Sequence, residues 1–210
     1  MALADWWHLF HQQIIETSWI EWLAVSFGVA EVLFAKSNNV ILYPAGIAGT
    51  LLSLYLFYIS GLYAECLLNG YYLIMSAYGW WYWVKKKNTP PVNITHCDRK
   101  EWRVVVSIVF AGFILLFTIL KNFTPSTVPF WDAVVSATAW AGMWLLAKRK
   151  IENWILLNIS NAFAIPLLFY KHLLLYAGLT IFLFIVAIQG YIKWKKILNK
   201  ETGVLKTLSV

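Results

Sequence analysis

The chain has 210 residues, of which 60% are hydrophobic and only 13% are charged. Soluble domains have about 25% charged residues, so this composition excludes an ordinary soluble fold and indicates a protein that crosses a membrane several times. The net charge of +7 does not indicate nucleic-acid binding, because the basic residues alternate with apolar segments and form no patch of their own.

Residues 1–17 precede the first apolar segment and contain Trp7, Phe10 and Ile14 beside Glu16. No basic region precedes an apolar core here, which argues against a cleaved signal peptide. We expect a short helix that lies in the membrane interface.

Seven apolar segments follow, each long enough to cross a bilayer as a helix. Their expected bounds are Ser18–Ala35, Val40–Ser60, Leu62–Val84, Trp102–Leu120, Pro129–Ala147, Ile151–Tyr170 and Leu173–Trp194. Several connections are very short, so consecutive segments form antiparallel hairpins. The stretch from Lys85 to Lys100 contains Pro90 and Pro91 and is predicted to be an irregular loop.

The chain repeats itself. When its second half is laid on its first, Ala35-Lys36 aligns with Ala147-Lys148, and after a gap of one position Trp83 aligns with Trp194. Two three-helix units joined by a single span must have the same orientation, which predicts a pseudo-twofold axis along the membrane normal and a site between the units.

The predicted fold is therefore an all-α integral membrane protein with seven transmembrane helices in a 3+1+3 parallel repeat. It divides the chain into an interfacial segment (1–17), a first three-helix unit (18–84), a loop and linking helix (85–128), a second unit (129–194) and a tail (195–210).

Orientation follows from the basic residues. Of the 17 Lys and Arg, fifteen lie in loops on one side of the predicted membrane, and only Lys121 and Lys171 lie on the other. Because basic loops stay in the cytoplasm, we expect the amino terminus outside and the carboxyl terminus inside a bacterial cytoplasmic membrane.

The third apolar segment carries a polar row. Glu65, Asn69, Tyr72 and Ser76 fall within about 60° of one another on a helix. Such groups need partners in hydrocarbon. They either bind neighbouring helices or line a substrate pathway, which we favour. The alignment of Trp83 with Trp194 places Tyr176 and Thr180 opposite Glu65 and Asn69.

The sixth apolar segment carries a second row, Trp154, Asn158 and Asn161. Trp154 alone is typical of an interfacial belt, but two Asn on the same face favour a binding site. The aligned residues Leu42, Gly46 and Gly49 are small or apolar, which predicts a single site. Trp and Tyr faces attract cations, and Glu65 supplies an opposing charge.

Two further acidic residues lie in the first apolar segment. Glu21 is expected at its outer edge, and Glu31 could pair with Lys36. The sequence contains no nucleophile motif, and His96, Cys97 and Asp98 are consecutive, which is poor geometry for a metal. We therefore expect no enzyme activity, no metal and no cofactor.

These features resemble the PnuC family of bacterial vitamin transporters. The resemblance covers nearly the whole chain and rests on LYAECLLNGYYLIMSAYGWWYW, on WILLNISN and on the basic cytoplasmic ends. It implies a fold like that of eukaryotic SWEET sugar transporters, a homotrimer, and facilitated diffusion of a vitamin that a cytoplasmic kinase traps. Trp154 and Asn158 resemble the family's stacking and hydrogen-bonding residues.

The resemblance leaves the vitamin open. Asn69 stands where members that carry nicotinamide riboside have Gln, and NNVILYP resembles the thiamine branch. Glu65 and Asn69, one helical turn apart, could pair with an aminopyrimidine. We therefore expect thiamine, with nicotinamide riboside as the alternative. A vitamin-binding subunit that does not itself transport is the alternative from another class.

Overall fold

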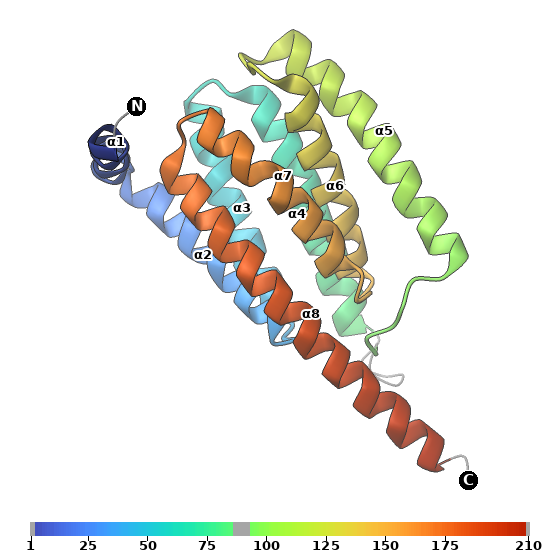
Figure 1. Ribbon diagram of the computed structural model, residues 1–210. Coiled ribbons are helices and arrows are strands. Elements are labelled where there is room, and N and C mark those ends of the chain that lie inside the picture. The colour runs from blue at the N-terminus through green and yellow to red at the C-terminus, as the bar shows by residue number, and fades with distance from the viewer. Residues whose placement is uncertain (1–2, 86–92, 209–210) are drawn as a thin grey trace.

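The computed structural model describes residues 3–85 and 93–208, and these form eight α-helices (Figure 1). The helices are α1 Leu3–Glu16, α2 Trp19–Lys36, α3 Leu42–Ile59, α4 Tyr63–Lys85, α5 Arg99–Phe123, α6 Pro129–Ala147, α7 Asn153–Tyr170 and α8 Leu174–Leu208. All seven predicted apolar segments fall on helices α2 to α8, so the expectation of an all-helical chain is confirmed.

Two helices begin at capping boxes that can be read from the sequence. Ser18 Oγ accepts the backbone N–H of Glu21 at 3.3 Å, and the Glu21 carboxylate accepts that of Ser18 at 2.6 Å. The chain bends by 101° there, between α1 and α2. Asp98 and Glu101 form the same box at the start of α5. The N–H of Glu101 holds the pKa of Asp98 below its usual range, because it stabilises the carboxylate.

Five of the described helices are long and apolar enough to cross a membrane, namely α3, α5, α6, α7 and α8, and the bent pair of α1 and α2 would make a sixth. Helix α4 is not one of the five; it carries Asn69 and many Tyr and Trp residues, which are less apolar than aliphatic side chains. Helix α2 taken alone is not one of the five, because it carries three charged residues, Glu21, Glu31 and Lys36. Polar residues thus reduce the spans recognised by composition below the seven expected.

The backbone repeats at one constant sequence offset. Helices α3 and α7 have the same length and begin at Leu42 and Asn153. The same offset relates Asn38 to Arg149, with left-handed φ of 55° and 59°, and Gly61 to His172, with φ of 72° and 58°. The alignment of Lys36 with Lys148 was therefore wrong by one position, because it matched letters across a turn that has no gap.

Each three-helix unit packs its first helix on its second and its second on its third. The units, α2–α4 and α6–α8, meet through two contacts, α2 with α8 and α4 with α6. Helix α5 lies at one edge of the bundle and packs along α6, and α8 continues beyond the other helices (Figure 1).

The turns α2–α3 and α6–α7 lie at the same end of the bundle. Arg149 Nε donates to Asn38 Oδ1 at 2.9 Å across the two turns, and Lys193 Nζ lies 3.4 Å from Ser37 Oγ. We call this the basic end, from Lys36, Lys148, Arg149, Lys150 and Lys193.

Candidate functional site

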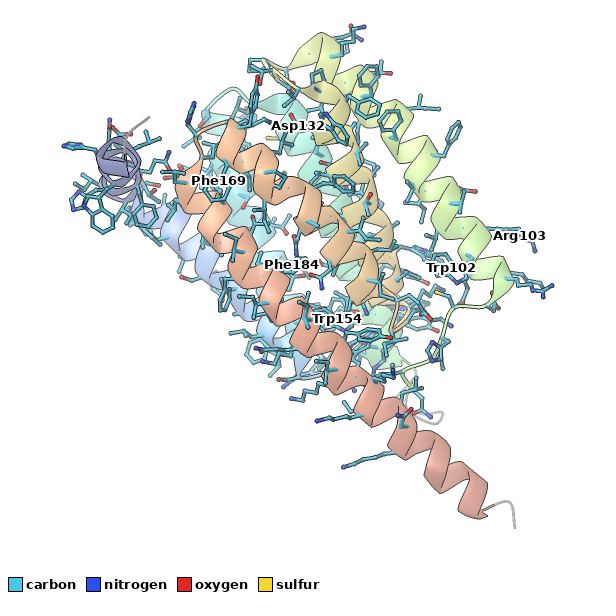
Figure 2. The ribbon with its side chains drawn as sticks, in the orientation of Figure 1. Trp102, Arg103, Asp132, Trp154, Phe169 and Phe184 are labelled. Atoms are coloured by element: carbon cyan, nitrogen blue, oxygen red, sulfur yellow. The ribbon has the colours of Figure 1, made fainter. Side chains whose placement is uncertain are left out.

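Trp154 lies in the first turn of α7, at the basic end (Figure 2). Its side chain is 1% exposed, and its indole Nε1 has no hydrogen-bond partner. The ring packs edge-to-face on Trp194 with centroids 5.7 Å apart. Gly190 of α8 makes room for it, since a Cβ at Gly190 would come within 2.7 Å of the indole. The position of Trp154 is therefore fixed from α8.

Asn158 follows one turn later, and the structure brings it together with Trp154. Its Oδ1 is buried without a partner. Both residues line a groove of about 390 Å³ between α7 and α8, beside Ile188 and Tyr191. Asn161 is half-buried one turn further along α7. A buried indole N–H beside a buried carbonyl oxygen offers a donor and an acceptor to a polar ligand.

Two residues of the polar row on α4, Tyr72 and Ser76, are placed by their surroundings. Tyr72 packs with Tyr71 against the buried cluster of Leu116, Ala137 and Trp140. Ser76 is 1% exposed, and its Oγ has no partner. Asn69 is half-buried, while the side chain of Glu65 lies outside the described residues. The groove that holds Trp154 is lined by residues of α7 and α8.

Tyr176 and Thr180 are not brought to Trp154. Tyr176 is 44% exposed and lines a different groove, of about 250 Å³, with Phe10 of α1 and Trp22 of α2. The Thr180 hydroxyl donates to the Tyr176 carbonyl of its own helix at 2.8 Å. Because Gly190 marks the level of Trp154 on α8, Tyr176 and Thr180 lie roughly 20 Å and roughly 15 Å away along the helix.

Glu31 is the residue that sequence reasoning undervalued. Its Oε1 is buried without a partner, and the carboxylate occupies the space where a Cβ at Gly46 would stand. The expected pairing with Lys36 is wrong, because Lys36 Nζ instead donates to Gln189 Oε1 at 2.6 Å. The available signal was a carboxylate within an apolar stretch, which marks a functional site by default.

Tyr43 of α3 lies near Glu31 and packs edge-to-face on Trp83. Its hydroxyl is buried without a partner, and it lies within electrostatic range of Glu31. Tyr72 of α4 is also within that range. Tyr43 and Trp154 belong to one buried cluster at the basic end. The carboxylate and the indole come from opposite units, and Tyr43 lies near the first and in the same buried cluster as the second.

Reciprocal hydrogen bonds close the basic end. Trp83 Nε1 of the first unit donates to the Ala147 carbonyl of the second at 3.2 Å, and Trp194 Nε1 of the second donates to the Ala35 carbonyl of the first at 2.9 Å. Each bond satisfies a carbonyl in the last turn of a helix. In this structure the two units are joined at the basic end.

The residues that the structure describes hold no group of three or more His, Cys, Asp or Glu side chains that could bind a metal ion. Trp154, Asn158 and Glu31 offer an aromatic ring, an amide and a carboxylate to a ligand.

The comparisons with known proteins agree with one another. The family model described as nicotinamide mononucleotide transporter matches residues 18–196. The nicotinamide riboside transporter PnuC of Escherichia coli (strain K12) is 21% identical over 206 residues, covering 85% of this chain and 86% of that protein, and the PnuC of Shigella flexneri matches equally. The crystal structure of the vitamin B3 transporter PnuC shares the fold, with a TM-score of 0.68, 23% identity, and coverage of 91% of this chain and 88% of that one.

The resemblance to PnuC proteins that the sequence suggested is thus confirmed, and with it a membrane location. The chain belongs to the nicotinamide mononucleotide transporter family, a family of transporters and not of enzymes.

Proposed function

We propose that this protein carries nicotinamide riboside across the bacterial cytoplasmic membrane by facilitated diffusion. The named relatives carry nicotinamide riboside or vitamin B3. The expectation of thiamine finds no support in the comparisons. It depended on Glu65 and Asn69 as a pair, and the Glu65 side chain lies outside the described residues.

The observation that carries the proposal is a set of buried polar atoms without partners, one on α2 and two on α7. Glu31 Oε1, Asn158 Oδ1 and Trp154 Nε1 are all buried and unsatisfied. A buried acceptor or donor without a partner costs about 1–3 kcal/mol, so a ligand that pairs with them gains that energy. A pyridinium ring with an amide and ribose hydroxyls offers the charge, donors and acceptors they need.

The same set favours the riboside over its phosphorylated form. Among the described residues no Lys or Arg is buried, whereas a phosphate taken out of water needs a cation. Glu31 would repel a phosphate and attract a cation. An inside-negative potential of 100 mV favours entry of a monovalent cation by about 2.3 kcal/mol, so uptake needs no coupled ion, and phosphorylation in the cytoplasm would trap the product.

We further propose that α2 to α8 all span the membrane, as two parallel three-helix units joined by α5. The constant offset between the units and the paired contacts α2–α8 and α4–α6 support the pseudo-twofold axis of a SWEET-like fold. The basic end would face the cytoplasm, with the amino terminus outside. The homotrimer implied by the resemblance stays a prediction.

Uptake by the purified protein in liposomes tests the function. We expect saturable entry of nicotinamide riboside. Entry should be faster with an inside-negative membrane potential and unaffected by a pH difference across the membrane in the absence of a potential. Excess thiamine should not compete. Binding without uptake would instead assign the protein as a binding subunit, and uptake of thiamine alone would reverse the choice of vitamin.

Topology needs a separate experiment. A reporter fused after Val210 should be active only in the cytoplasm, and one fused before Met1 only outside. Both termini on one side would overturn the odd number of spans.

A further inference from the structure

A short segment crosses the α6–α7 turn at the basic end. We call Ile94–Cys97 the strap. Thr95 forms a parallel β-bridge with Lys150, in which Thr95 N donates to the Arg149 carbonyl at 3.3 Å and Ile151 N donates to the Thr95 carbonyl at 3.1 Å. These bonds fix the strap to the turn that leads into α7.

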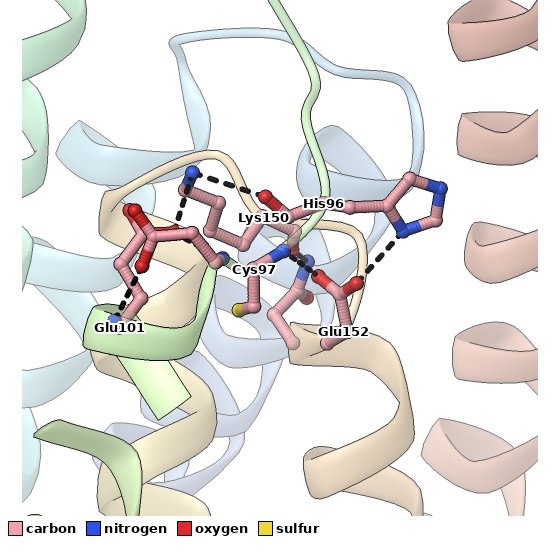
Figure 3. Close-up of polar contacts among 7 residues, drawn as sticks. His96, Cys97, Glu101, Lys150 and Glu152 are labelled. Atoms are coloured by element: carbon pink, nitrogen blue, oxygen red, sulfur yellow. Dashed lines mark hydrogen bonds and ion pairs between the residues drawn. The ribbon is translucent and has the colours of Figure 1, made fainter. Parts of the chain in front are cut away.

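Glu152, the last residue before α7, holds the strap with its side chain (Figure 3). Its carboxylate is 12% exposed and lies 2.8 Å from His96 Nδ1. The other oxygen accepts the backbone N–H of Cys97 at 3.1 Å. Burial, and then the Glu152 charge, raise the pKa of Cys97 to about 12, so that the thiol stays neutral.

Lys150 fastens the same turn to α5. Its Nζ lies 2.8 Å from Glu101 Oε2 and 3.3 Å from the His96 carbonyl (Figure 3). The strap also reaches the substrate region directly, because Ile94 is 1% exposed and belongs to the buried cluster that contains Trp154.

The start of α7 is held by backbone hydrogen bonds of its own turn and by the strap. The Glu152 side chain makes no capping bond to α7, so the first turn, which carries Trp154, lacks the usual side-chain cap. The position equivalent to Glu152 in the first unit is Ile41, which is 48% exposed and whose N–H bonds only to the neighbouring Asn39. Of the two described turns, the strap holds the one that leads to Trp154.

We propose that Glu152 is a positioning residue: by binding the strap, it sets the place of Trp154 and Asn158 in the binding site. The inference rests on the proposed function for its ligand, nicotinamide riboside. Glu152 itself touches no ligand, and its effect passes through the first two turns of α7.

The decisive variant is Glu152→Ile, which gives the second unit the residue of the first. We expect nicotinamide riboside to bind the folded variant at least fivefold more weakly in a fluorescence titration. Glu152→Gln keeps one acceptor for the Cys97 N–H, replaces the oxygen that faces His96 with an NH2 donor and removes the charge, so we expect about a twofold weakening. The matched control is Glu101→Gln, which breaks the ion pair with Lys150 and leaves the strap bonds, and it should bind as the wild type does.

A second measurement needs no ligand. Amide hydrogen exchange of residues 151–158 should be faster in Glu152→Ile than in the wild type, while residues 42–49 of α3 remain unchanged. A purely structural role would lower the amount of folded protein and leave both the affinity and this local pattern unaltered.

Unchanged affinity in Glu152→Ile, or weaker binding without faster exchange at 151–158, would overturn the proposal. If Glu152→Ile does not fold, Glu152→Gln is judged by the same two measurements. If the wild type fails to bind nicotinamide riboside, the proposed function is wrong, and the exchange comparison still decides whether the strap holds α7.

Discussion

The two three-helix units have nearly the same backbone and different chemistry. At equivalent positions the first unit has Tyr43 and Ile47 where the second has Trp154 and Asn158. Both aromatic residues pack on a glycine and beside a Trp of the third helix of their unit, at 5.3 Å for Tyr43 and 5.7 Å for Trp154. The packing of an aromatic ring on a glycine and beside a Trp occurs in both units, whereas the hydrogen-bonding amide of Asn158 has no equivalent in the first.

One pair of positions is reversed between the units. In the first, Glu31 of α2 fills the space above Gly46 of α3. In the second, Leu157 of α7 fills the space above Gly142 of α6, and Gly142 is the position equivalent to Glu31. The first unit thus has the large residue on its first helix and the glycine on its second, whereas the second unit has the glycine on its first helix and the large residue on its second. The large residue is a carboxylate in the first unit and an apolar Leu in the second. The bundle therefore buries one such carboxylate at these positions, which suits a single cationic ligand.

Truncation of Trp154 should have the largest effect. Trp154→Ala removes a fully buried ring, which lowers the free energy of unfolding by about 3–5 kcal/mol, and also removes the ligand contact. The matched variant is Trp83→Ala in the first unit, with a similar stability loss. We expect binding at least tenfold weaker for the first and little changed for the second, by titration of folded protein. Equal losses of binding would mean that the two units contribute alike.

The Glu31 carboxylate should come next. Glu31→Gln keeps the shape and removes the charge, and a hydrogen bond to a charged group is worth about 1.5–3 kcal/mol, so binding of nicotinamide riboside should weaken about tenfold or more. Glu21→Gln changes a carboxylate of the same helix outside the site and is the control. If both variants bind as the wild type does, Glu31 only fills the space beside Gly46 and does not contact the ligand.

The close packing of Trp154 on Gly190 can be tested by adding a single methyl group. Gly190→Ala places a Cβ within 2.7 Å of the indole, whereas Gly178→Ala on the same helix meets nothing within 4 Å. Overpacking costs typically about 1–3 kcal/mol, so we expect binding to weaken several-fold for the first variant and to stay unchanged for the second. Retained affinity in Gly190→Ala would show that the indole can shift without loss.

The reciprocal tryptophan bonds should give the smallest and most even effects. Trp83→Phe and Trp194→Phe each remove one indole N–H bond, worth about 1 kcal/mol. We expect similar decreases of the thermal midpoint, because each bond joins the same pair of units. A large difference between the two decreases would show that one of the two hydrogen bonds contributes most of the stability of the contact between the units.

Much of the fold could be predicted because its signals are local. Apolar runs, short turns and the Ser18–Glu21 spacing report secondary structure within one stretch of chain. The offset between the units was misjudged by one position because the matching letters at Ala35-Lys36 and Ala147-Lys148 are not equivalent in the backbone. The equivalent turn residues, Asn38 and Arg149, differ in type and share only their left-handed φ.

The site was only partly predictable because it depends on contacts between helices. Trp154 and Asn158 share one helix face, which periodicity reveals. The carboxylate of Glu31 is accommodated by Gly46 of another helix, and the spacing of residues within α2 cannot predict that contact. Tyr176 and Thr180 were placed by symmetry, and symmetry transfers a backbone position without transferring the cavity beside it.

Helix α8 runs unbroken from Leu174 to Leu208. At 1.5 Å per residue it is roughly 52 Å long, well beyond the roughly 30 Å of a hydrocarbon core. It passes Gly190, against which Trp154 rests, and continues out of the bundle (Figure 1). The helix therefore touches the binding site near its middle and projects from the bundle at one end. A tilt of about 10° around Gly190 would move the far end, roughly 27 Å away, by about 5 Å. A probe on the projecting arm would therefore report events inside the membrane.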